Sequence, residues 1–493
     1  MSGITPSPSP STVASPEAVP PARLSGHMGV LDIVFSVLAF NAPMSVFVGF
    51  ITVIIGFGNG IGAPLVFIAT GVLMLLFAVG FTTMSRDLPN PGAFYAYITA
   101  GLGRPVGLGS AFVALVSYLF ILVGGYCFGG ISWQSLIHDR FGGPDIPWWV
   151  YTLATVIVVS ILGYFHINLS AKILMIFMIL ETIVMVAYDV VVLARGGDGG
   201  TASLSLAPLT PANAFGGSIG LAVIFGVVCF SGFEATAVFR EEARTPEKTV
   251  PRATYTAIIF LMVLYALTAW AMINGIGLEH AVKASAADPT GAAFATAEVY
   301  LTKIGVDVVN LLLCTSIFAA NLAAHNVSTR YIYSLSVDRI FPGVLSSVHT
   351  KQQSPHRASI LVSVITVISI GVCAALNGNP NTLYAALVGI GGYALILLLL
   401  LTSIGVVVYF RRKPGAKARV ARTIVAPALA VIGLAVAFVI ATQNVDVMIG
   451  GSVGLAVALV VLFFALLIAG IVAALILKRT RPSVYARIGR QDV

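Results

Sequence analysis

Long runs of apolar residues follow one another along almost the whole chain, separated by short polar connections. Each run holds roughly 20 residues, which is the length that a helix needs to cross the hydrocarbon of a bilayer. The runs lie near 30–55, 60–84, 105–137, 148–165, 170–194, 214–239, 251–277, 304–335, 357–376, 382–409, 423–443 and 451–477. The pattern predicts an all-α integral membrane protein with about twelve transmembrane helices.

Two of these runs are interrupted near their middle. The first is broken at 41–45 (Asn-Ala-Pro-Met-Ser) and the sixth at 230–234 (Phe-Ser-Gly-Phe-Glu). Pro43 has no N–H and its ring clashes with a carbonyl one turn earlier, whereas Ser231 and Gly232 loosen the helix. A lone proline or glycine often only bends such a helix. A pair of interruptions in matching positions of two halves indicates the midplane site of a secondary transporter.

The half-helices on either side of a break expose backbone groups that can bind a ligand. N–H groups at a helix N-terminus suit a carboxylate, and carbonyl groups at a C-terminus suit an ammonium group or a cation. One cavity between the breaks could therefore bind both ends of a zwitterion. The predicted substrate-binding residues are Asn41, Ala42, Pro43, Met44, Ser45, Phe230, Ser231, Gly232, Phe233 and Glu234.

The spacing of the breaks predicts an internal repeat. Because they fall in spans one and six, the first ten spans divide into two groups of five, and repeats of odd number must be inverted relative to each other. We expect a 5+5 inverted-repeat transporter core over 28–410, two extra helices with a preceding basic loop over 411–477, and a cytoplasmic tail over 478–493. The proline-rich segment 1–27 is predicted to be a disordered cytoplasmic tail and not a signal peptide.

Composition and charge support a membrane protein and give its orientation. Only 9% of the residues are charged, against about 25% in soluble domains. If both termini are cytoplasmic, four of the 27 Lys and Arg residues fall in outside loops: Arg140, Arg195, Lys283 and Lys303. The other 23 would lie on the cytoplasmic side, and such an excess of Lys and Arg is typical of cytoplasmic loops. It predicts a multi-pass protein of the bacterial plasma (inner) membrane, whose net charge of +8 faces anionic lipid and not nucleic acid. The longest outside loop, 278–303, is expected to form a short helix over the mouth of the bundle.

Three acidic residues fall inside predicted spans. Glu181 has no basic residue within two helical turns. Because an unpaired carboxylate at membrane depth favours its neutral form, Glu181 can carry a proton and is the candidate ion- or proton-coupling residue. Alternatively, it is a permanently protonated residue that bonds a neighbouring helix. Glu234 lies within the second break and could satisfy freed N–H groups, whereas Asp189 is expected at the membrane interface.

Other residues with reactive side chains carry weaker signals. His325 could line the cytoplasmic path, although a lone membrane histidine is more often a packing residue. The cysteines are scattered and show neither metal-ligand nor disulfide spacing. No metal and no organic cofactor is expected, and the coupling ion is H⁺, with Na⁺ as the alternative.

Three groups of residues resemble one protein family. The first is 230–234 followed by Glu-Glu-Ala-Arg-Thr-Pro at 241–246 and Val-Pro-Arg-Ala at 250–253. The second is Met-Ser-Arg at 84–86 with Pro-Gly-Ala-Phe-Tyr-Ala-Tyr at 91–97. The third is 326–342, with Arg330, Tyr333, Asp338 and Pro342. They are similar to the sixth-helix signature, the second-to-third helix connection and the eighth-helix end of the amino acid–polyamine–organocation superfamily.

The resemblance covers about residues 29–410 and implies a LeuT-type fold, with substrate held between broken helices one and six. It also implies an amino acid or amine permease, usually proton-coupled. The chain departs from the family pattern at two places. Many members carry Gly-Ser-Gly or Gly-Ala-Gly in the first break, where this chain has Pro43-Met44-Ser45 with fewer free amides, which leaves room for an amine. Some members place a lysine near the position of Glu181, and a carboxylate there could relay protons, bind sodium or bind an amine.

We therefore predict a secondary transporter for an amino acid or a related small amine, working by proton symport. Substrate–product antiport is the alternative, and a channel or sensor on the same fold is a further one. Spans one, two, six and seven would rock against the remainder. The sequence contains neither repeated selectivity-filter residues nor a phosphate-binding loop, and it does not predict an enzyme. The partners are a small-molecule substrate and the lipid bilayer, and the oligomeric state is left open.

Overall fold

The computed structural model describes residues 29–88, 93–165, 171–234, 244–349, 354–376, 379–413, 420–449 and 451–489. Within these ranges nine helices are long and apolar enough to cross a membrane, and three shorter apolar helical segments join them. Together they correspond to the twelve predicted spans. The same ranges contain no β-strand, only an isolated bridge between Gly197 and Ala202. The all-helical, multi-span fold class is thus confirmed.

The spans and their connections follow the order of the apolar runs. The first six comprise α1 (Val30–Asn41), α2 (Pro43–Ser45), η1 (Val46–Phe50) and α3 (Ile51–Phe57); η2 (Gly60–Gly62) and α4 (Ala63–Met84); α6 (Arg104–Gln134) and η3 (Ser135–Arg140); α7 (Trp148–Tyr164); α8 (Ala171–Arg195); and α10 (Ile219–Val228). The last six comprise α11 (Pro246–Ile276); α13 (Pro289–Val337); α14 (His356–Ala375); α15 (Pro380–Arg412); η8 (Ala421–Val425) and α16 (Ala426–Gln443); and α18 (Val453–Thr480). The connecting elements are α5 (Ala93–Leu102), η4 (Asp198–Gly200), η5 (Ala207–Leu209), α9 (Pro211–Ala214), α12 (Ala281–Ala287), η7 (Gly343–Ser346), α17 (Val445–Met448) and α19 (Pro482–Arg487).

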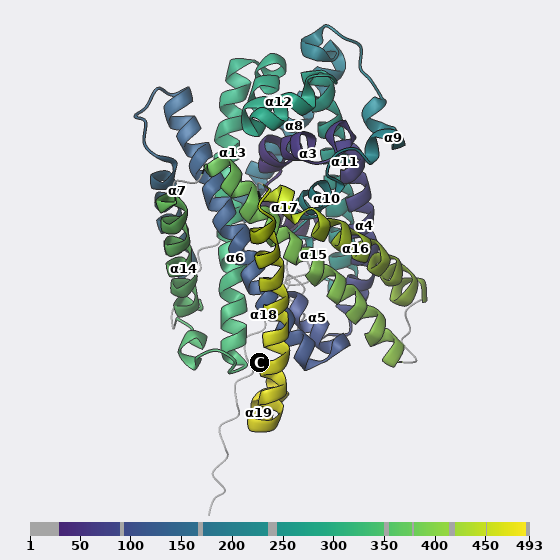
Figure 1. Cartoon of the computed structure of the whole chain (residues 1–493), viewed down its shortest axis with the longest axis vertical. Coiled ribbons are helices and arrows are strands. Elements are labelled where there is room, and N and C mark those ends of the chain that lie inside the picture. The colour runs from purple at the N-terminus through teal and green to yellow at the C-terminus, as the bar shows by residue number, and fades with distance from the viewer. Residues whose placement is uncertain are drawn as a thin grey trace, which may run out of the picture.

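The bundle has two distinct ends. Figure 1 shows α9 and α12 at one end, and α5, α19 and the C-terminus at the other. We call these the α12 end and the α19 end. The short helix expected within 278–303 is confirmed as α12, and it packs against α3. The contact is close, because a side-chain carbon at Gly56 would lie 2.7 Å from the carbonyl carbon of Ser285.

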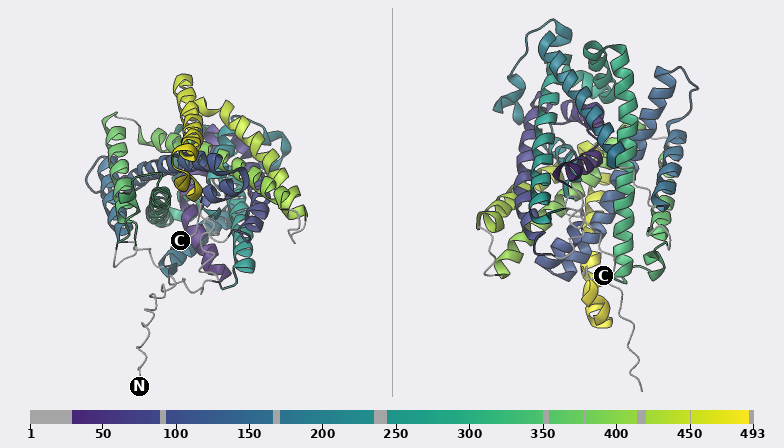
Figure 2. Two further views of the ribbon diagram at one scale, coloured as in Figure 1. Left: turned by 90° about the horizontal axis from the view of Figure 1, so that it is seen from below. Right: turned by 180° about the vertical axis from the view of Figure 1, so that it is seen from behind.

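Helix α6 runs through the centre of the bundle and contacts α15, α18, α13 and α7 (Figure 2). Small residues allow these close approaches, as is usual between transmembrane helices. A side-chain carbon at Gly391 on α15 would lie 2.8 Å from the carbonyl oxygen of Ser117 on α6. Ser117 Oγ in turn donates a hydrogen bond of 2.7 Å to the Gly391 carbonyl oxygen. This contact fixes α15 against α6.

The last two spans lie at the edge of the bundle. In the most apolar 18-residue window of α18 only 17% of the residues are buried, and in that of α16 only 28%, against 67% in both α11 and α15. The apolar side chains of α16 and α18 therefore face outward, where lipid would cover them. Helix α14 is as exposed as α16, with 28% of its most apolar window buried, so the division into a ten-span core and two added helices stays a prediction.

The α19 end carries a chain of contacts that the sequence pattern did not predict. The backbone N–H of Gly489, just after α19, donates to Tyr95 Oη on α5 at 2.6 Å and lies 3.3 Å from Asp338 Oδ2. The Tyr95 hydroxyl donates to the same carboxylate at 2.7 Å. Arg104 at the start of α6 stacks over Tyr485 of α19, 5.4 Å from the ring centroid. The C-terminal segment is thus docked on α5 and on the end of α13.

Candidate functional site

The first span is interrupted where the sequence predicts. Helix α1 ends at Asn41, Ala42 adopts a left-handed backbone conformation (φ 47°, ψ 67°), and α2 begins at Pro43. Such a conformation is unfavourable for an alanine, and Pro43 cannot continue the hydrogen-bond ladder. Ser45 stabilises the turn, because its Oγ donates to the carbonyl oxygen of Ala42 at 2.6 Å. A π-helical segment, η1, follows directly, a feature often found at functional sites.

Glu181 reaches this break from α8. Its Oε2 accepts a hydrogen bond of 3.0 Å from the backbone N–H of Met44 and one of 2.9 Å from Ser316 Oγ on α13. The Glu181 side chain is buried, with 1% exposure. Met44 carries one of the N–H groups that a helix N-terminus leaves without an intrahelical partner, and a carboxylate is favourable there. The structure thus brings the predicted coupling residue into contact with the first break.

The second break is held by its own carboxylate. Helix α10 ends at Val228, and Gly232 adopts φ 103°, which a side chain would disfavour. The N–H of Gly232 donates to Glu234 Oε2 at 2.8 Å, and the Tyr118 hydroxyl of α6 donates to Glu234 Oε1 at 2.7 Å. The expectation that Glu234 satisfies freed N–H groups is confirmed. Residues 235–243, which hold part of the sixth-helix motif, lie outside the described residues.

Tyr265 on α11 packs against the second break. Its ring lies edge-on to that of Phe230, with centroids 6.2 Å apart, and carries a hydroxyl group. That hydroxyl is buried and has no hydrogen-bond partner among the described residues. The other aromatic of the second break, Phe233, packs edge-on against Phe77 of α4 at 5.6 Å. No sequence motif marks Tyr265, which stands alone in a long apolar run.

Four aromatic rings form a cluster. Phe50 of η1 stacks on Phe225 of α10 with centroids 5.7 Å apart, and Phe128 of α6 stacks on Tyr384 of α15 at 4.5 Å. Phe50 also contacts the other two rings, Phe128 and Tyr384. All four side chains are buried. This aromatic cluster joins η1, α6, α10 and α15.

Two further predicted residues lie elsewhere. Asp189 is enclosed by protein: its side chain is 1% exposed and accepts a hydrogen bond of 2.9 Å from Thr268 Oγ1 on α11. His325 packs between helices, with Nε2 2.9 Å from Ser359 Oγ on α14. The packing alternative for this histidine is therefore the one observed. Among the described residues, no group of three or more His, Cys, Asp or Glu side chains could hold a metal ion.

Comparisons with known proteins agree with this architecture. The sequence profile of a family described as "Amino acid permease" matches residues 34–484. The low-affinity putrescine importer PlaP of Escherichia coli K12 is 23% identical over 358 residues, which cover 71% of this chain and 75% of the relative. The branched-chain amino acid permease BcaP of Bacillus subtilis 168 is 24% identical over 400 residues, or 77% and 79% of the two chains. The lysine-specific permease LysP of Lactococcus lactis is 21% identical over 331 residues, or 62% of each chain.

The profile covers nearly the whole described chain, from the first span to α19. The twelve apolar segments are consistent with a permease of this family. The chain is therefore a multi-pass membrane transporter, not an enzyme, and belongs to the amino acid permease family of the amino acid–polyamine–organocation superfamily.

Proposed function

We propose that this protein moves an amino acid or a related small amine across a bacterial plasma membrane by proton symport. Substrate would bind between 41–45 and 230–234, and Glu181 would carry the coupled proton. The observation that carries the proposal is the hydrogen bond from the Met44 N–H to Glu181 Oε2. It puts a carboxylate, which can take up a proton, directly on the backbone of the proposed substrate site.

The same contact would link protonation to movement. In the proposed transport cycle, spans one, two, six and seven rock as a bundle against the other spans. Met44 belongs to that bundle, whereas Glu181 and Ser316 belong to the stationary spans five and eight. A hydrogen bond to an ionised group is stronger than one to a neutral group. Protonation of Glu181 would therefore weaken a contact between the moving and stationary parts.

The position of Glu181 also gives a reason for cotransport. The carboxylate of an α-amino acid would bind at the N-terminus of α2, where Glu181 already accepts the Met44 N–H. Two negative charges at one site repel each other, and the repulsion is strong where little water is present. A neutral, protonated Glu181 removes that repulsion. Proton and amino acid would then bind together, on the same side of the membrane, and leave together on the other.

A cationic amine is a second candidate substrate, and the same residue supports it. An ionised Glu181 at the first break would attract an ammonium group rather than repel it. The chain also lacks the glycine-rich first break that presents free amides to a substrate carboxylate. One relative, PlaP, is named as a putrescine importer. For such a substrate, release of the cation and protonation of Glu181 would alternate.

Counterflow uptake into proteoliposomes tests the transport function and separates the two substrate classes. Vesicles containing the purified full-length protein are loaded with one unlabelled compound and diluted into the same compound in labelled form. Branched-chain and basic amino acids form one arm, and diamines form the other. Saturable counterflow with any of them supports a carrier, and the preferred arm identifies the substrate class. Linear, gradient-limited flux would refute the carrier and favour a channel.

The coupling ion is tested separately in vesicles without internal substrate. Uptake driven by an inside-alkaline pH gradient supports proton symport. Uptake that requires external sodium at constant pH would replace the proton with sodium. If only vesicles preloaded with substrate take up label, whatever the ion gradients, the protein is an antiporter.

A further inference from the structure

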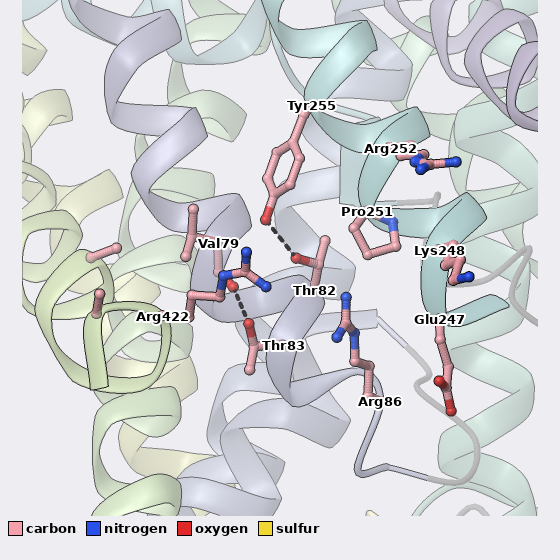
Figure 3. A pocket seen from close by; sticks show the side chains of 12 residues that line it. Val79, Thr82, Thr83, Arg86, Glu247, Lys248, Pro251, Arg252, Tyr255 and Arg422 are labelled. Carbon is pink, nitrogen blue, oxygen red and sulfur yellow. Dashed lines mark hydrogen bonds between the residues drawn. The ribbon is translucent and has the colours of Figure 1, made fainter. Parts of the chain in front are cut away.

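A cavity of about 650 Å³ lies at the α19 end, away from the two breaks. It opens where α4 ends, where α11 begins, and at η8 before α16. Figure 3 shows that its lining comes from these three elements. Because the ends of transmembrane helices lie at the depth of the lipid headgroups, this cavity opens at the surface of the membrane. The proposed substrate site, by contrast, lies at mid-depth.

The cavity is strongly basic. Four cationic side chains line it, Arg86, Lys248, Arg252 and Arg422, against a single acidic one among the lining residues, Glu247. The guanidinium groups of Arg86 and Arg422 approach each other across the cavity from different elements (Figure 3). A lining with an excess of cationic groups attracts anions. Arginine in particular matches the geometry of phosphate oxygens.

The uncharged part of the lining is apolar or hydrogen-bonded within the protein. Thr82 Oγ1 lies 3.1 Å from the Tyr255 hydroxyl, and Thr83 Oγ1 donates to the carbonyl oxygen of Val79 at 2.6 Å. Val79, Pro251, Ala421 and Ala426 supply apolar walls beside the cationic groups. A small hydrated anion gains nothing from such walls, whereas the glycerol and acyl regions of a lipid do.

We propose that this cavity binds a phosphate-bearing anion, and that its occupant is the phosphodiester headgroup of an anionic phospholipid. Basic pockets between transmembrane helices are suited to such headgroups. The cavity joins α4 and α11, which belong to the proposed moving bundle, to α16, which does not. A bound headgroup would therefore bridge the two parts, and the transport rate would depend on the fraction of anionic lipid. The binding site itself does not rest on the proposed transport function.

The experiment measures lipid retention and needs no transport. The full-length protein is placed in nanodiscs of phosphatidylcholine with a minor fraction of phosphatidylglycerol, released, and analysed by native mass spectrometry. The double variant Arg86→Gln/Arg422→Gln removes two cations from the cavity. The matched control Arg479→Gln/Arg481→Gln removes two cations from the same end of the bundle, outside the cavity. Elution volume and thermal unfolding temperature show that each variant is folded.

We expect the wild type and the control to retain phosphatidylglycerol, and the cavity variant to bind it about 25-fold more weakly, because each cation near the surface contributes about fivefold. Equal retention by the cavity variant and the wild type would overturn the proposal. A further arm adds millimolar inorganic phosphate to lipid-depleted protein. If phosphate raises the unfolding temperature of the wild type but not of the cavity variant, and no lipid is retained, the occupant is a free phosphate and the lipid assignment is wrong.

Discussion

Replacement of Glu181 by glutamine tests the central step of the proposed mechanism. The change keeps a side-chain oxygen that can accept the Met44 N–H and the Ser316 hydroxyl, both of which now bind Glu181 Oε2. It removes the ability to carry a proton. Hydrogen bonds to charged groups exceed those to neutral groups by about 1 kcal/mol each. The Gln variant should therefore lose no more than about 2 kcal/mol of stability and remain folded.

Glu181→Ala is a harsher change. It removes both hydrogen bonds and leaves the buried Met44 N–H without its acceptor. An unsatisfied buried donor costs about 1–3 kcal/mol, and the lost side-chain packing adds to this. The Gln variant is therefore the informative one for coupling, and the Ala variant measures how much the contact contributes to stability.

The expected effect on transport follows from the energy of the gradient. A pH difference of one unit corresponds to about 1.4 kcal/mol per proton, so symport of one proton with each neutral substrate allows accumulation of up to about tenfold. The wild type should approach that ratio in proteoliposomes. In Glu181→Gln the ratio should fall to one, because no proton accompanies the substrate. Counterflow exchange, which needs no net proton movement, should persist.

A matched control lies on the same helix. Asp189→Asn also neutralises a buried carboxylate of α8, but that residue bonds Thr268 and not the first break. We expect this variant to retain accumulation. Radiolabelled uptake with an imposed gradient, measured for the wild type and both variants, gives the comparison. Unchanged accumulation by Glu181→Gln would refute the assignment of Glu181, and equal loss in both variants would show that the effect is not specific to the break.

Three further changes probe the site and its surroundings. Tyr265→Phe removes a buried hydroxyl that has no partner among the described residues, so the unfolding temperature should not fall. If the hydroxyl binds substrate, the KM for transport should rise about three- to tenfold. An unchanged KM would exclude that contact. Gly49→Val should destabilise the protein by about 1–3 kcal/mol, because a side-chain carbon there would lie 2.6 Å from Phe128 Cζ. The control Gly371→Val lies on α14, where a side-chain carbon would have nothing within 4 Å. Its unfolding temperature should be almost that of the wild type. Burial raises the pKa of Asp338, at the end of α13, so its contribution to stability is greatest below the ordinary aspartate pKa of about 4 and declines as the pH rises through the folded-state value. The unfolding temperature of the wild type should therefore fall relative to that of Asp338→Asn as the pH rises above about 4, and a constant difference would contradict this reasoning.

The fold was largely predictable because the bilayer imposes a simple rule. A backbone that crosses hydrocarbon must satisfy its own hydrogen bonds, so long apolar runs become helices. The positions of the breaks were predictable for the same reason, because Pro43 and Gly232 disrupt a helix through their own covalent structure. The left-handed conformation of Ala42, directly before Pro43, was not predicted. Short elements such as α5 escaped prediction, because an apolar run of ten residues is too short to indicate a transmembrane helix.

The contacts within the site were much less predictable. Nothing in the sequence indicates that Glu181 meets Met44, which lies 137 positions away along the chain. That contact depends on the rotation and depth of two helices, and neither leaves a local signal. Tyr265 was missed for a related reason, because its role depends on the rings and charges of other spans. Glu234 was easier, because its partner Gly232 is two residues away and the break itself exposes that N–H.

The two breaks bind a backbone N–H in the same way, but the two carboxylates come from different parts of the bundle. At each break a freed backbone N–H is bound by a glutamate carboxylate, Met44 by Glu181 and Gly232 by Glu234. Glu234 belongs to the same broken segment as its amide, so that hydrogen bond can persist while the proposed bundle moves. Glu181 comes from a span outside the bundle, so its hydrogen bond to Met44 must change whenever the first span shifts against α8 and α13. Glu234 also accepts a hydrogen bond from the Tyr118 hydroxyl of α6, a span outside the proposed bundle, so both carboxylates connect the proposed moving and stationary parts. Glu181 alone of the two does so through a backbone N–H of the other part, and this is why we propose Glu181 as the coupling residue.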